Sequence, residues 1–365
     1  MTLAKNWEHG SHFHLLTSWP STVSPMPWGD NHSLYGSGRQ ALRALMEYGR
    51  ANRGWRRLWV PSYFCQACIF CFTPLMEVKL YPDHPWESGP QLDKIEPKPG
   101  DVLFVTNLFG LRAKPDMGAL DRSQMEVVED HFHDPCSKWA WTSDADWCVV
   151  HLRKTLPVPD GGLLWSPAGH PLPPALPVTP EHQVVALEKL AAMALKTLYL
   201  EDYPIEKDNF RGLAVSGEDS LRTGCAIGKV SGMTSWSANV FPTFPIEIWR
   251  ERRRRNHGIV SAGLADLPWV KVLQPVTDAD TCPYAAILVV DSPERRSHLS
   301  QKLIAARIYP TILWPFEESA TKEIPQVDID FSQRMLTIHC DLRYTEADME
   351  YVIALIRKYG EEYSD

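Results

Sequence analysis

The sequence predicts an α/β protein with two domains, and three observations support this prediction. Short apolar segments alternate with helical ones over the first two thirds of the chain, a pattern typical of a parallel sheet with helices on both faces. The chain has 365 residues, 44% of them apolar and 22% charged, so it is globular and long enough for two cores. From residue 245 onward the pattern changes to that of a compact α+β unit.

The larger domain is expected to span residues 32–244. Before it, residues 1–31 are rich in Trp, Pro, Ser and His without a clear period, and we expect an irregular leader that lies on the body. The first helix, 39–52, has apolar residues at helical spacing and a capping signal in Ser37-Gly38. The next elements are expected to be strand 57–60, helix 65–75, strands 77–81, 101–106, 125–128, 147–151 and 161–165, and a helical stretch at 184–200.

Residues 245–365 are expected to form a smaller C-terminal domain. It begins with a long basic helix, and the run from Arg250 to Arg255 is expected to be a face exposed to solvent. The elements predicted after it are strand 285–290, helix 292–306, strands 308–313 and 336–338, and a closing helix at 345–359. No internal repeat is visible.

Charge and cysteine content exclude several classes of protein. Lys and Arg number 37 and Asp and Glu 45, and the resulting net charge of −8 would repel a nucleic-acid backbone. Eight cysteines are too few for a disulfide scaffold in a chain of this length. No segment is typical of a signal peptide or a membrane span. We therefore expect a cytoplasmic protein without nucleic-acid or membrane partners.

Two patterns that resemble metal sites are expected to be structural. Cys65, Cys68 and Cys71 have the spacing of a ferredoxin run, but no fourth cysteine follows, and apolar neighbours indicate thiols packed in a helix. His9, His12 and His14 would bind zinc only if the leader folded them together. We expect no metal site.

A carboxylate and a lysine follow two successive predicted strands. Asp130 closes one strand, and Lys154 comes 24 residues later, after the next strand. In open α/β sheets ligands bind beyond the carboxyl ends of the strands, so both side chains are expected to face one crevice. Pyridoxal phosphate needs such a pair, because a lysine amine binds its aldehyde and a carboxylate keeps its ring nitrogen protonated. On spacing alone, a surface salt bridge remains an alternative.

Five short motifs occur along the chain: Tyr35 to Leu42 (YGSGRQAL), Val60 to Tyr63 (VPSY), Asn107 to Gly110 (NLFG), Val128 to His133 (VEDHFH) and Arg153 to Gly162 (RKTLPVPDGG). In this order they resemble those of the DegT/StrS-type aminotransferases. These are pyridoxal-phosphate enzymes of the aspartate-aminotransferase fold, and most of them aminate nucleotide-linked keto sugars. The resemblance runs from about Leu34 to the C-terminal helix and implies fold type I, with a large cofactor-binding domain and a smaller C-terminal domain.

The resemblance also implies roles for individual residues. Lys154 is the expected Schiff-base lysine, Asp130 the partner of the ring nitrogen, and His133 the neighbour of the phenolic oxygen. The other expected cofactor ligands lie at the start of a helix and near the slot for a stacked aromatic ring; they are Gly38 and Arg39 for the phosphate, and Tyr63 and Phe64 for the ring.

The sequence departs from the family pattern at two places. The stacking position itself is Cys65, and Val149 stands where many relatives have a serine that binds the phosphate. Family architecture supplies further phosphate donors from a second subunit, and in this chain the corresponding region holds Ser235, Ser237 and Asn239. The resemblance therefore implies a homodimer with shared sites.

The predicted activity is that of a pyridoxal-phosphate-dependent aminotransferase. By family analogy the amino donor is glutamate and the acceptor a nucleotide-linked keto sugar. Relatives that dehydrate sugars have histidine at the lysine position, so Lys154 favours transamination. Two alternatives stay open: another reaction of the same cofactor, such as a lyase or a transferase on a non-sugar substrate, and a non-catalytic binding or regulatory protein with this fold.

Overall fold

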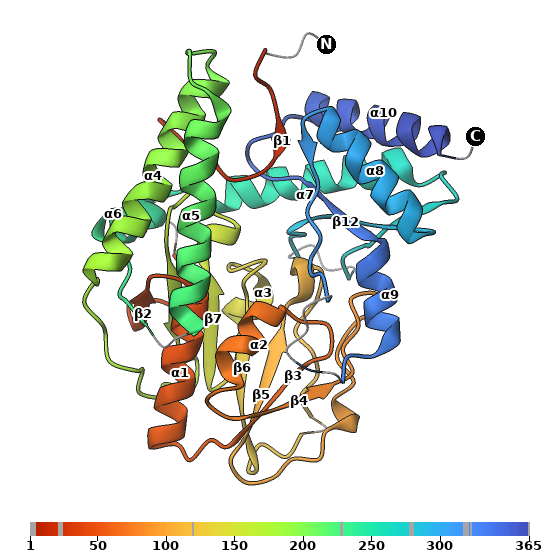
Figure 1. Cartoon of the computed structure of the whole chain (residues 1–365). Helices are drawn as coiled ribbons and strands as arrows, with labels where there is room; N and C mark the ends of the chain where they lie inside the picture. The colour runs from red at the N-terminus through yellow and green to blue at the C-terminus, as the bar shows by residue number, and fades with distance from the viewer. Residues whose placement is uncertain are drawn as a thin grey trace.

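A computed structural model describes residues 5–20, 25–118, 120–226, 229–276, 281–316, 321 and 323–363. Its main feature is a seven-stranded sheet in the order β2-β8-β7-β6-β5-β3-β4 (Figure 1). Five neighbouring strands, β7, β6, β5, β3 and β4, run parallel. At the other edge β8 pairs antiparallel with β7, and β2 pairs antiparallel with β8. The strands are β2 (His32–Tyr35), β3 (Arg57–Pro61), β4 (Glu77–Tyr81), β5 (Asp101–Thr106), β6 (Met125–Asp130), β7 (Trp147–His151) and β8 (Gly162–Trp165).

Both faces of this sheet are buried, which explains why its strands are apolar throughout. Along β5, Val102 and Phe104 belong to one apolar cluster, while Leu103 and Val105 belong to the other. Three helices accompany this part of the sheet, namely α1 (Gly38–Asn52), α2 (Gln66–Phe72) and α3 (Lys138–Trp141). The predicted mostly parallel sheet covered on both faces is confirmed, although α2 is shorter than the helix expected at 65–75 and β2 was not predicted.

Two long helices form a hairpin beside the sheet domain (Figure 1). They are α4 (Pro180–Leu200), which contains the helical stretch predicted at 184–200, and α5 (Lys207–Ala226), which was not predicted. The short helix α6 (Ser235–Val240) follows them. Neither these helices nor any other described helix is both long and apolar enough to cross a membrane.

The C-terminal part is built on a separate antiparallel sheet, β12-β10-β9, with α7 starting one residue after the expected domain boundary. The closing helix α10 has a capping box in which Thr345 and Asp348 exchange hydrogen bonds. Helix α9 and strand β9 were not predicted. The elements are α7 (Ile246–Leu264), β9 (Val270–Val272), β10 (Ala285–Val290), α8 (Pro293–Ala305), α9 (Gln326–Arg334), β12 (Met335–His339) and α10 (Glu346–Glu362).

The leader is more ordered than the sequence indicated. Its residues His9–Gly10 form strand β1, which pairs in parallel with β11 (Ile308–Tyr309). The strand expected at 308–313 is therefore only two residues long, and its partner is the leader. Glu8 is buried between Lys196 of α4 and Lys207 of α5. The leader thus joins the helical hairpin to the C-terminal domain.

The expectation that the run from Arg250 to Arg255 faces solvent is wrong for two of its members. Arg250 and Arg253 are buried. Nε and Nη2 of Arg250 each donate to the carboxylate of buried Asp134 at 2.9 Å, so a charge in the large domain requires this cation. Arg255 does face solvent, with 71% of its side chain exposed.

Candidate active site

Asp130 and Lys154 lie at the same edge of the sheet. Asp130 is the last residue of β6, and Lys154 ends a 3-10 helix, Leu152–Lys154, that directly follows β7. β6 and β7 are parallel neighbours, with Asp130 opposite Val149 in their register. The carboxyl ends of both strands therefore open toward the C-terminal domain, as expected of a ligand site in an α/β sheet.

The Asp130 carboxylate is buried, and Oδ1 accepts a hydrogen bond from the Phe132 amide at 2.8 Å. Burial raises the pKa of Asp130 well above its usual range, although the positive charge of Lys154 acts in the opposite direction. A second cation beside this carboxylate, such as a protonated ring nitrogen, would favour its ionised form. The surroundings of Asp130 therefore stabilise its ionised carboxylate only when a positive group lies beside it.

His133 presents a buried hydrogen-bond donor without a partner. Its Nδ1 accepts from the Phe109 amide at 3.1 Å, so the proton of the neutral ring lies on Nε2. Burial and the charge of Lys154 hold the pKa of His133 well below its usual range, which keeps the ring neutral. Nε2 is buried and has no hydrogen-bond partner in the described part of the chain. Because such a group is costly to leave unsatisfied, an acceptor oxygen on a ligand fits this place.

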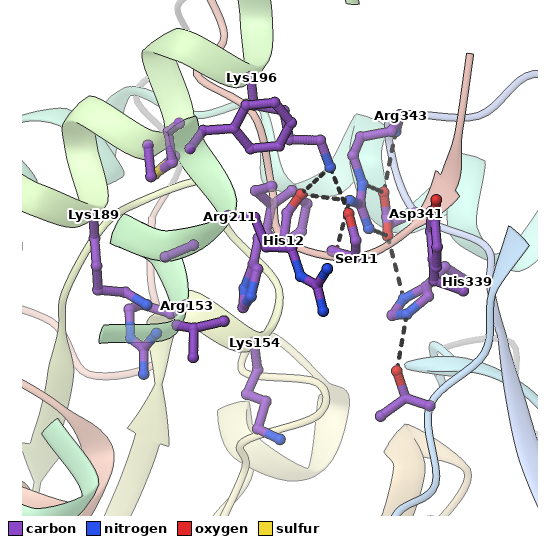
Figure 2. A pocket seen from close by; sticks show the side chains of 18 of the residues that line it. Ser11, His12, Arg153, Lys154, Lys189, Lys196, Arg211, His339, Asp341 and Arg343 are labelled. Carbon is purple, nitrogen blue, oxygen red and sulfur yellow. Dashed lines mark hydrogen bonds and ion pairs between the residues drawn. The ribbon is translucent and has the colours of Figure 1, made fainter. Parts of the chain in front are cut away.

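Lys154 lines a cavity of about 810 Å³ (Figure 2). The walls come from the leader, α4, α5 and the C-terminal domain. The amine of Lys154 lies 6.0 Å from the centre of the Tyr284 ring and makes no hydrogen bond or ion pair with any described residue. Several other cations of the cavity are paired, namely Lys189 with Glu218, Lys196 with Glu8, and Arg343 with Asp341. Lys154 is therefore available for covalent chemistry.

The aromatic residues expected near the cofactor ring lie deeper than the cavity wall. Tyr63 is fully buried among aromatic rings and donates its hydroxyl to the Leu313 carbonyl, while Phe64 packs against Phe104 and Trp314. Cys65, the next residue, is partly exposed. A hydrogen bond with Cys68 and the charges of Lys154 and Arg39 lower the pKa of the Cys65 thiol to about 6. Cys65 is thus within electrostatic reach of Lys154.

Gly38 and Arg39 begin α1, whose cap is the Ser37 hydroxyl. A Cβ on Gly38 would lie 2.7 Å from Cβ of His151, so only glycine allows the helix to approach the end of β7 this closely. Arg39 is buried and donates to Glu218 of α5 at 3.3 Å. Arg153 and Lys189 bind the same carboxylate. The sequence gives no sign of this cluster, because Glu218 lies in a helix without a recognisable motif.

The loop after Lys154 is fixed by Asp160, which corrects one expectation about phosphate donors. Ser237 is fully buried and donates to Asp160 of its own chain. Asp160 also accepts from Thr234 and from His182. Ser237 is therefore committed within its own chain and is no donor to a second subunit, whereas Ser235 remains exposed.

The residues present fit pyridoxal phosphate. The amine of Lys154 has no hydrogen-bond or ion-pair partner among the described residues. The carboxylate of Asp130 is buried, where a cation would stabilise its ionised form, and Nε2 of His133 is a donor without an acceptor in the described part of the chain. His151, beside Gly38, also has a buried Nε2 without a hydrogen-bond partner among the described residues. These unsatisfied groups surround one end of the sheet, where a polar ligand would satisfy them together.

Solved structures of other proteins share this architecture. DesV of S. venezuelae, solved in complex with a ketimine intermediate, matches with a TM-score of 0.56 and 18% identity over 91% of this chain and 85% of its own. Another match is Spr1654 from Streptococcus pneumoniae, described as a sugar aminotransferase and solved in its pyridoxal-phosphate form. Its TM-score is 0.56 and its sequence identity 13%, over 95% of this chain and 93% of its own. DesI, solved with its TDP-sugar product, matches with a TM-score of 0.54 and 14% sequence identity over 90% of this chain and 80% of its own.

No family model and no curated protein matches the sequence. The structural likeness covers nearly the whole chain at low identity, so what it shows is the fold. The predicted fold type I, a mostly parallel sheet with flanking helices and a smaller C-terminal part, is confirmed.

Proposed function

We propose that this protein is a pyridoxal-phosphate-dependent aminotransferase. One observation carries the proposal: the unpaired amine of Lys154, the buried carboxylate of Asp130 and the unpaired Nε2 donor of His133 lie at one edge of the sheet. Each matches a different part of the cofactor. A structural salt bridge between Asp130 and Lys154 would leave the His133 donor without a purpose, so the ligand interpretation explains more of the site.

The chain's own groups then have distinct tasks. The cofactor supplies an aldehyde and an electron-accepting ring. Lys154 would hold that aldehyde and, with its amine free, would move a proton at the donor's α-carbon. Asp130 would keep a positive charge on the ring nitrogen, and His133 would donate from Nε2 to the phenolic oxygen. The Tyr284 ring lines the same cavity, 6.0 Å from the Lys154 amine.

The substrates we propose are glutamate as donor and a nucleotide-linked keto sugar as acceptor. Support comes from the fold shared with DesI, whose structure contains a TDP-sugar product. The cavity also suits an anionic substrate, because Arg211 lines it and has no ion-pair or hydrogen-bond partner among the residues that the structure describes (Figure 2).

We further propose a cytoplasmic homodimer whose large domain spans residues 32–244. The cysteines that the structure describes are all free thiols, which supports a reducing compartment. Ser235 and Asn239 are exposed on α6 and so are open to contact with a second subunit.

Reductive trapping tests the proposed activity. Purified protein with pyridoxal phosphate should absorb near ~420 nm, as protein-bound forms of this cofactor do, and borohydride should fix the cofactor to Lys154. Glutamate should remove the band in a single turnover. Lys154→Met should abolish both signals, while Lys358→Met, at a lysine whose side chain is 64% exposed on α10, should change neither. A labelled peptide that lacks Lys154 would contradict the proposal.

A further inference from the structure

We infer that Arg153 and Lys189, which Glu218 holds in position, bind the phosphate of the cofactor. The inference rests on the proposed function and deepens it, because it assigns the phosphate anchor to the α4–α5 hairpin of the same chain. Neither residue belongs to the set that the sequence motifs predicted.

The cluster contains more positive than negative charge. Glu218 accepts from Arg153 Nη1 at 2.7 Å, from Lys189 Nζ at 3.2 Å and from Arg39 Nη2 at 3.3 Å. These four side chains thus comprise three cations and one carboxylate. The side chains of Arg153 and Lys189 are only 11% and 7% exposed, so water screens these two cations poorly, whereas that of Glu218 is 38% exposed. A phosphate dianion would offset the excess of positive charge.

Glu218 stays ionised in this surrounding. The charges of Arg153, Lys189 and Arg39 hold the pKa of Glu218 far below its usual range, with Arg153 as the largest influence. Two histidines also face the cluster, His12 from the leader and His151 from the end of β7. Burial lowers the pKa of both, that of His12 to about 4, so both rings are neutral at pH 7 and leave the balance of charge unchanged.

The cluster lies where the phosphate is expected. Arg153 precedes Lys154 in the chain, and Arg39 is the second residue of α1, whose N-terminus favours anions. His151 packs on Gly38 at that N-terminus, and its buried Nε2 has no partner among the described residues. Figure 2 shows the Lys189 ammonium beside the Arg153 guanidinium at one side of the cavity that Lys154 lines.

Two phosphate donors that the family resemblance would supply are missing from this site. Val149 is fully buried and cannot donate a hydrogen bond where relatives use serine, and Ser237 is bound to Asp160. A phosphate needs several charge-assisted hydrogen bonds in their place. Arg153 is suited to this role because a guanidinium matches phosphate geometry, and its buried Nε has no partner in the described part of the chain.

The experiment compares two aldehydes that differ only in the phosphate. Pyridoxal phosphate and pyridoxal are each titrated into wild-type protein and Lys189→Met, and the dissociation constant is read from the absorbance of the lysine adduct. Lys196→Met is the matched control, because Lys196 is also a buried lysine of α4 that lines the cavity and is paired with one glutamate. Lys189→Met should weaken binding of pyridoxal phosphate at least about tenfold, the worth of one charge-assisted hydrogen bond.

The same variant should leave the affinity for pyridoxal within about twofold of wild type, and the control should change the ratio of the two affinities by no more than that. Arg153→Gln should repeat the selective loss, which covers the case that Lys189→Met does not fold. Equal losses for both aldehydes, or no loss, in a wild type that forms the adduct would overturn the inference alone. If wild-type protein forms an adduct with neither aldehyde, the proposed function fails and the inference falls with it.

Discussion

Glu8 anchors the leader to the protein, and we predict that Glu8→Gln destabilises the fold by about 2–3 kcal/mol at pH 6. The Glu8 side chain is 2% exposed and lies 2.7 Å from Lys196 Nζ, whose side chain is 4% exposed. Removal of one partner from a buried ion pair costs roughly 3–5 kcal/mol. We expect a smaller value because the amide still accepts hydrogen bonds and because Lys207, the second partner, is one-third exposed.

The deficit should depend on pH in a defined direction. Burial lowers the pKa of Lys196 to about 8 even with Glu8 present, and loss of Glu8 lowers that pKa further. Between its folded and unfolded pKa, the lysine binds more protons in the unfolded state, so stability rises with pH there. In the variant the folded pKa of Lys196 is lower, so its stability begins to rise at a lower pH than that of the wild type. Its deficit should therefore be largest near pH 6 and shrink as the pH rises through 8.

Urea denaturation of both proteins at pH 6 and pH 9 measures the effect, and hydrogen exchange of the His9 amide, which donates to the Arg307 carbonyl, reports leader release. Glu47→Gln is the control, because Glu47 is 45% exposed in a helical pair with Arg43 and its loss should cost less than about 0.5 kcal/mol. A Glu8→Gln deficit no larger than this, or one equal at both pH values, would refute the reasoning.

Three further predictions concern the site and the packing of the two domains. Asp130→Ala should lower turnover by about 10²–10³-fold, as removal of one buried electrostatic contact in an active site does, while it still binds cofactor in an absorbance titration; unchanged turnover would mean that the ring nitrogen lies elsewhere. Arg250→Ala should lower the free energy of unfolding by about 3–5 kcal/mol in urea denaturation, because it leaves the buried Asp134 carboxylate without its cation. Arg255→Ala, at an exposed arginine, should lower it by less than about 1 kcal/mol. Equal losses would contradict a stabilising buried pair. If the homodimer shares its cofactor sites, pyridoxal phosphate should shift sedimentation of dilute protein from monomer toward dimer; a monomer that binds the cofactor equally well would rule out shared sites.

The sequence predicted the sheet well because the burial of both faces leaves a local signal. β3, β5 and β7 are continuous apolar runs between polar or turn residues, and the structure places them close to the expected bounds. Asp130, His133 and Lys154 were predicted from short motifs, and the structure places Asp130 at the end of β6 and Lys154 just after β7. Their roles toward a cofactor stay predictions.

Features that depend on distant partners left no such signal. Arg250 reads as part of a solvent-exposed basic run, but its partner Asp134 is 116 residues away. Helix α5 was also not predicted. It packs closely on the preceding helix, α4, where a Cβ on Gly217 would lie 2.5 Å from the Lys189 side chain. The phosphate cluster that we infer unites residues from α1, α4, α5 and the loop after β7, so no single stretch of sequence contains it.

The pairing of β1 with β11 also constrains the order in which the protein can mature. His9 pairs with Ile308, so the leader emerges from the ribosome long before its partner strand exists. At typical rates of synthesis the delay is about 15–60 s. During that time Glu8 has no lysine partner until α4 and α5 are made, and the cavity has no wall from β11 or β12. A polypeptide that stops short of residue 308 therefore lacks the part of the cavity wall that Tyr309, Thr311 and His339 provide.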